Sequence, residues 1–137
     1  MNRQDFQNLA FIRLKEAEVL LQNGQYSGAY YLSGYVVECA LKACIARHTK
    51  EFDFPDKQMA IDSHTHDLVK LVKNAKLDKE LASRRSDPSF GSNWLLVIEH
   101  WKPESRYKTY TEQEAHDMYS AIADPDYGVF QWLQQHY

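Results

Sequence analysis

The arrangement of apolar and polar residues along the chain predicts helices throughout. Residues 26–48 carry the clearest pattern, because apolar side chains recur there at the 3.6-residue period of an α-helix on two adjoining faces. Only a narrow stripe remains on that helix, formed by Tyr31, Tyr35, Glu38 and Lys42. A helix that is apolar around most of its circumference is normally buried among other helices. We therefore expect this helix at the centre of the fold, with the Glu38 carboxylate inside it.

Further helices are expected before and after the central one. A helix over residues 4–23 ends at Gly24, and the link to the central helix is so short that the two must run antiparallel. A helix is next expected over residues 65–75, with Ser63 or Thr65 as its cap, followed by a short turn at 77–83 and a short helix over 93–101 that ends before Pro103. The capping box of Thr111 and Glu114 opens another helix. The last helix either begins with Asp124 as N-cap and Pro125 at its first position or continues the preceding helix with a kink.

The segments between these helices are expected to be loops. Residues 49–63 show no sustained period, and we expect Phe52 and Phe54 to fold back onto the core. Residues 84–92 are polar and rich in helix breakers, so they are also expected to form a loop. The pattern as a whole predicts an all-α, up-and-down antiparallel bundle of four main helices plus short ones. We expect it to form a single domain over residues 1–137.

Composition and charge narrow the class of protein. A chain of 137 residues with 44% hydrophobic residues suits one domain with one core. The net charge of -3 gives no overall basic field for nucleic acid, so any such contact must be local. Cys39 and Cys44 lie on one predicted helix and point in different directions, which suits small core residues in a reducing compartment. We expect no signal peptide or membrane span, and hence a cytoplasmic protein.

Three stretches of the sequence resemble a known family. They are RLKEAEVLLQNGQYSGAYYLSGYVVECALKACIA at 13–46, HTHDLVKLVKNAKL at 64–77, and NWLLVIEHWKPESRY at 93–107, which is followed by a helix ending in VFQWL. In this order they resemble HEPN domains (higher eukaryotes and prokaryotes nucleotide-binding), specifically the small stand-alone prokaryotic members. The resemblance implies an antiparallel helical bundle that commonly forms a homodimer. It also implies RNA or nucleotides as ligands, no cofactor, and, in many members, a neighbouring minimal nucleotidyltransferase within a toxin–antitoxin or stress-response pair.

The resemblance also indicates which residues a catalytic member of the family needs. Several members are metal-independent ribonucleases, and their signature is an Arg followed after four to six residues by a His. Here Arg106 stands where the Arg is expected, but Thr111 and Glu112 stand where the His would be, and the next histidine is His116. If the chain cleaves RNA, Arg106 would hold the scissile phosphate and His66 or His116 would move the proton from the 2′-hydroxyl nucleophile. The alternative is a non-catalytic dimeric module that binds a nucleotide or a protein.

Glu38 is the central candidate for a binding site. A buried carboxylate must meet a cation or hydroxyl groups, since its burial alone is costly. Lys42, one helical turn further on, is the structural partner, whereas Arg106 or His66 would make a functional one. The candidates for contact with nucleotide or RNA are Glu38, Tyr35, Asp67 and Tyr107. The resemblance adds that a tyrosine near the catalytic motif is nucleotidylated by the partner enzyme in related systems.

Three further features have alternative interpretations. A predicted helix begins with His64, His66 and Asp67. The two histidines face different ways, so we expect no metal site. The Asp67 carboxylate interacts favourably with the helix dipole at this end. A small basic cluster would contact RNA phosphates or form a solvated face, and its members are Lys76, Lys79, Arg84 and Arg85. Trp94 and Trp101 are expected in the core or at a dimer seam.

Overall fold

A computed structural model describes residues 1–48 and 63–137 of the chain. Its elements are α1 (Arg3–Gln22), α2 (Tyr26–Arg47), α4 (Leu68–Asn74), α5 (Asp78–Arg84), α6 (Pro88–His100), the 3₁₀ helix η1 (Pro103–Tyr107), α7 (Glu112–Ala123) and α8 (Val129–Gln134). No strand occurs among these residues, so the prediction of an all-α fold is confirmed. The expectation about Phe52 and Phe54 falls outside the described residues.

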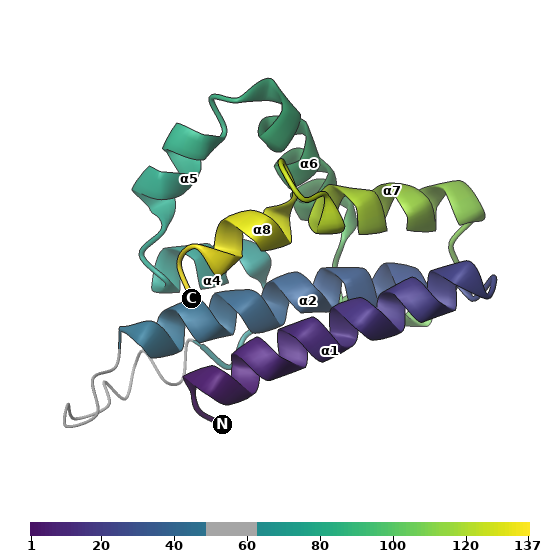
Figure 1. The fold of residues 1–137 in the computed structure, drawn as a ribbon, viewed down its shortest axis with the longest axis horizontal. Coiled ribbons are helices and arrows are strands. Elements are labelled where there is room, and N and C mark those ends of the chain that lie inside the picture. The colour runs from purple at the N-terminus through teal and green to yellow at the C-terminus, as the bar shows by residue number, and fades with distance from the viewer. Residues whose placement is uncertain (49–62) are drawn as a thin grey trace.

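Helix α2 lies at the centre of the fold, as its sequence pattern predicts. It forms a long antiparallel hairpin with α1, and α4, α7, α8 and η1 also pack against it (Figure 1). Helix α6 packs on α7 and α8, farther from the hairpin. The buried face of α2 includes Val36, Val37 and Leu41, all with no exposed surface. The many small residues of α2 allow neighbouring helices to approach it from several sides.

Local capping signals set the ends of α1 and α7. Asn2 and Asp5 form a capping box at the start of α1, with each side chain accepting the other residue's backbone N–H. Gly24, with φ of 76°, follows the C-cap of α1 in the left-handed conformation that glycine favours. The predicted capping box of α7 is confirmed, since Thr111 Oγ1 accepts from the Glu114 backbone N–H at 3.2 Å and Glu114 Oε1 accepts from that of Thr111 at 2.9 Å.

Two helices begin elsewhere than the sequence suggested. Helix α4 begins at Leu68, because the Asp67 carboxylate accepts from the backbone N–H groups of Val69 and Lys70 and thereby takes the cap from Ser63 and Thr65. Helix α6 begins at Pro88, so the prediction of a loop over 84–92 is wrong for its second half. Asp87 caps α6 with Pro88 at the first helical position, which allows Phe90 to enter the core.

The last helix also begins later than predicted. Asp124 and Pro125 do not open it, because Asp124 Oδ1 accepts from the backbone N–H groups of Asp126 and Tyr127 and forms a turn instead. Helix α8 starts after Gly128, where a Cβ atom would overlap the Asp124 carbonyl. The turn separates α8 from α7, so the two are not one kinked helix.

The remaining features of the core follow their structural interpretations. Trp94 and Trp101 are buried in the core, and Cys39 and Cys44 are free and buried. Burial raises the pKa of both thiols to about 12. In the basic cluster, Arg84 donates to the Asp126 carbonyl at 3.0 Å and lies over aromatic rings, so it stabilises the turn before α8. None of the described helices has the length and apolar character that crossing a membrane requires.

Candidate functional site

The buried carboxylate of Glu38 lies between two donors. Its side chain is 2% exposed, and Oε2 lies 3.2 Å from Nζ of Lys42, one turn further along α2. From the other side, Nδ1 of His66 lies 3.0 Å from both Oε1 and Oε2. The structure thus joins the structural partner and one of the two functional partners that the sequence proposed. Each contact offsets part of the desolvation that burial of a carboxylate costs.

His66 reaches Glu38 from the segment that leads into α4. The next residue, Asp67, is the N-cap of α4, and its own N–H donates to Thr65 Oγ1 at 3.1 Å. These local bonds fix the backbone on both sides of the histidine. The His66 side chain remains 59% exposed although its Nδ1 contacts a buried group. One edge of the ring therefore faces the core while the rest stays accessible to solvent.

Trp101 anchors the opposite side of the site to α2. Its indole ring lies directly on Gly34, where any Cβ atom would overlap the ring. The indole Nε1 donates to the Tyr31 carbonyl at 3.0 Å. The next residue, Lys102, donates its N–H to the hydroxyl of buried Ser105 at 3.1 Å, which holds the first turn of η1. This contact between Trp101 and Gly34 places η1 against α2 on the side where His66 lies.

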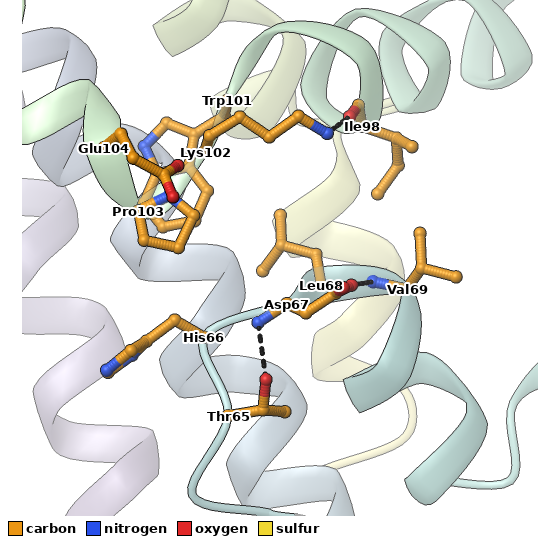
Figure 2. Close-up of a pocket in the computed structure, with 10 residues that line it drawn as sticks. All are labelled: Thr65, His66, Asp67, Leu68, Val69, Ile98, Trp101, Lys102, Pro103 and Glu104. Carbon is orange, nitrogen blue, oxygen red and sulfur yellow. Dashed lines mark hydrogen bonds between the residues drawn. The ribbon is translucent and has the colours of Figure 1, made fainter.

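A cleft of about 440 Å³ opens between these two sides. Figure 2 shows the residues that line it, which come from the start of α4, the end of α6 and η1: Thr65, His66, Asp67, Leu68, Val69, Ile98, Trp101, Lys102, Pro103 and Glu104. Apolar side chains form much of its wall. The volume lies in the range of small-molecule sites, and polar residues make up half of the lining.

Arg106 and His116 do not line this cleft. Arg106 is exposed on η1, with its guanidinium carbon 4.8 Å from the ring centroid of Tyr107, which is 76% exposed. His116 is exposed on α7, where its Nε2 lies 3.9 Å from Glu112 Oε1. The structure therefore brings together Glu38 and His66, and it places neither Arg106 nor His116 beside them.

Tyr35 lies on the same stripe of α2, one turn before Glu38. Its ring centroid is 6.1 Å from that of Tyr31, and the Tyr31 ring in turn lies 5.9 Å from Trp101. Burial, with smaller contributions from Cys39 and Glu38, raises the pKa of Tyr35 to about 12. The hydroxyl therefore stays protonated at neutral pH and acts as a hydrogen-bonding group, with no role as a base.

The sequence alone did not identify Lys102 and Glu104 as residues of the cleft. The signal that points to this region is Gly34, because a glycine inside an apolar helix often marks a close approach by another segment. Among the described residues, no group of three or more His, Cys, Asp or Glu side chains is placed to hold a metal ion.

The fold is that of a small helical domain with a cleft beside a buried carboxylate, and comparison with known families specifies it further. A family model described as the HEPN domain matches residues 4–125, most of the chain. The chain therefore belongs to the HEPN domain family, as its sequence resemblance indicated. Membership associates it in general terms with nucleotides and RNA. Neither the curated proteins nor the solved structures include a match to the chain.

The two donors around Glu38 generate a stability prediction. Lys42→Met leaves one carboxylate oxygen with less compensation, so we expect the free energy of unfolding to fall by about 1.5–3 kcal/mol, the usual contribution of a hydrogen bond to a charged group. In a Glu38→Gln background the same substitution should cost less than half as much, because the buried charge is already gone. Urea denaturation of the four proteins measures both values. Equal costs in the two backgrounds would show that Lys42 does not act through Glu38.

Proposed function

We propose that this HEPN-domain protein binds a ribonucleotide, either free or as part of an RNA strand, in the cleft beside His66. The observation that supports the proposal most is the contact of exposed His66 with buried Glu38 at the edge of a cleft of about 440 Å³. A histidine that is oriented by a buried carboxylate is a common arrangement at binding and catalytic sites.

The shape and lining of the cleft suit a nucleoside. Leu68, Ile98 and Pro103 provide apolar contact for the face of a base. Carboxylates of Asp67 and Glu104 and the His66 ring provide polar contacts at the edge. Such pockets bind drug-sized or nucleoside-sized ligands through apolar walls and a small number of oriented polar groups.

The phosphate of the ligand would lie toward η1. Lys102 lines the cleft and Arg106 lies farther along η1, outside it; both are exposed. Lys102 Nζ donates to the Ile98 carbonyl at 3.1 Å, and an anionic phosphate oxygen would be a stronger acceptor for the same ammonium. A local pair of cations is consistent with a protein whose net charge is -3, because the contact then involves only one or two phosphates.

We propose binding in preference to RNA cleavage. The family's ribonuclease signature requires an Arg and a His that act together, whereas Arg106 lies on η1 and His116 on α7, and neither lines the cleft. This arrangement favours the non-catalytic alternative within the family.

The role of Arg106 can be measured with a labelled single-stranded RNA oligonucleotide. We expect Arg106→Ala to weaken binding and to reduce the slope of log K against log salt by about one, because one phosphate contact is lost. Lys108→Ala is the matched control, since Lys108 is also exposed and lies directly after η1. Unchanged affinity in Arg106→Ala would remove Arg106 from the proposal. Incubation of the same RNA with the wild-type protein should leave it intact, and cleavage that depends on Arg106 would restore the ribonuclease alternative.

We also propose that a nucleotidyltransferase modifies this protein, within a toxin–antitoxin or stress-response pair. The observation that favours it is the exposure of Tyr107, a residue that is 76% exposed. It lies beside Arg106, a cation that would attract the triphosphate of the donor nucleotide. Incubation with a minimal nucleotidyltransferase and ATP should add one nucleotidyl group to the wild-type chain, with release of pyrophosphate, and none to Tyr107→Phe. Mass spectrometry detects the adduct, and equal modification of both proteins would contradict the assignment to Tyr107.

HEPN domains commonly dimerise, and we propose a homodimer through α1. One face of α1 carries the exposed apolar residues Phe11, Ile12 and Val19, which are 52%, 48% and 56% accessible. Large apolar residues exposed on one side of a helix are typical of protein interfaces. We expect light scattering to give the mass of a dimer for the wild-type protein and of a monomer for Phe11→Asp. Val69→Asp, at a residue of similar exposure on α4, should remain dimeric. A monomeric wild-type protein would contradict the dimer itself.

A further inference from the structure

We propose that Glu38 holds His66 in a single tautomer, with the proton on Nδ1 and an acceptor nitrogen, Nε2, left for the cleft. That acceptor would select a ligand with a ribose 2′-hydroxyl over its 2′-deoxy counterpart. The selection rests on the proposed binding of a nucleotide in the cleft, whereas the tautomer is a property of the free protein.

The tautomer follows from the contacts of the carboxylate. Nδ1 of His66 lies 3.0 Å from both Oε1 and Oε2 of Glu38, and the Lys42 ammonium donates to Oε2 from the other side. An ionised carboxylate can only accept hydrogen bonds, so the nitrogen that faces it must carry the proton. In a neutral imidazole the other nitrogen is then an acceptor. Glu38 is thus a positioning residue that acts through His66.

The second nitrogen, Nε2, is the one that we propose for the ligand. Nε2 of His66 makes no hydrogen bond with any residue among 1–48 and 63–137, and the side chain is 59% exposed at the edge of the cleft. Figure 2 shows the ring beside the cleft, projecting from the segment before α4. An acceptor that has no partner among the described residues favours a ligand that brings a donor to that point.

The other polar side chains of the cleft favour donors as well. Asp67 and Glu104 carry carboxylates, which accept, and Lys102 already donates to the Ile98 carbonyl. These acceptors suit the hydroxyl-bearing sugar of a nucleotide, whereas the ammonium of Lys102 suits its phosphate. A site built to bond a hydroxyl rejects the analogue that lacks it, because its acceptor is then left without a partner. The 2′-hydroxyl is the group by which proteins distinguish RNA from DNA at a given position.

The tautomer is tested without any ligand. Long-range ¹H–¹⁵N correlation spectra of the uniformly labelled protein, recorded at about pH 8 where a free imidazole is neutral, report which ring nitrogen carries the proton. We expect the wild-type His66 signals to show a protonated Nδ1 and an unprotonated Nε2, and Glu38→Gln to give a mixture of both forms. The His66→Phe protein identifies the signals by their loss. A protonated Nε2 in the wild-type protein would overturn the inference.

The selection is tested by calorimetric titration with adenosine 5′-monophosphate and 2′-deoxyadenosine 5′-monophosphate. For the wild-type protein we expect the ribonucleotide to bind about tenfold more tightly, which corresponds to one hydrogen bond near the upper end of its usual range. In Glu38→Gln the ratio should fall to about twofold or less, mainly through weaker binding of the ribonucleotide. Glu99→Gln, which removes an exposed carboxylate on α6, is the control and should keep the wild-type ratio.

A third variant covers the case in which Glu38→Gln does not fold. His66→Phe removes the acceptor at an exposed position and leaves Glu38 paired with Lys42, and it should also bring the ratio to about twofold or less. Equal wild-type affinity for the two nucleotides would overturn the selection and leave the proposed binding function in place. Binding of neither nucleotide would overturn the proposed function together with the selection, while the spectra would still decide the tautomer.

Discussion

A charged group inside the most apolar helix is the constraint on which the site depends. Glu38 is 1% exposed on α2, and the desolvation of an unpaired carboxylate would destabilise the fold strongly. Lys42 offers one donor from the same helix, but a carboxylate has room for more than one. His66 supplies the second from a segment 28 residues away in sequence. The need to satisfy one carboxylate therefore ties the start of α4 to the centre of α2, and the cleft forms beside that connection.

Periodicity and capping chemistry predicted the elements that depend on local sequence. Helices α1, α2 and α7 fall close to their expected ranges, because an apolar face, a glycine at a helix end or a capping box acts within one or two turns. The pairs Asp87–Pro88 and Asp124–Pro125 show that local signals alone do not determine where a helix begins. The first pair opens α6 and the second opens a turn, although both are good helix starts. The difference comes from contacts elsewhere in the chain, such as the bond from Arg84 to the Asp126 carbonyl.

The candidate site was predictable only in part, for a related reason. The stripe on α2 indicated that Glu38 needs a partner, and the sequence offered His66 and Arg106 without a way to choose. The choice depends on the path of η1, which is set by the packing of Trp101 on α2 across 67 positions of the chain, from Gly34 to Trp101. Family resemblance correctly indicated the fold. It gave no guidance on a cleft built by the start of α4 and the first residues of η1, because that cleft arises from long-range packing.

The contact between Gly34 and Trp101 gives the cleft two walls of unequal stiffness. A glycine within a helix destabilises it by roughly 0.5–1 kcal/mol relative to alanine. Here Gly34 lets the indole pack directly on the helix backbone. This wall therefore cannot shift without moving α6 or η1 with it. The opposite wall is held at His66 by hydrogen bonds from an exposed ring, which break and reform far more easily than a packed aromatic contact. A ligand that needs more space would therefore displace the His66 side and leave the Trp101 side in register with α2. The cleft would then widen by movement of the His66 side alone.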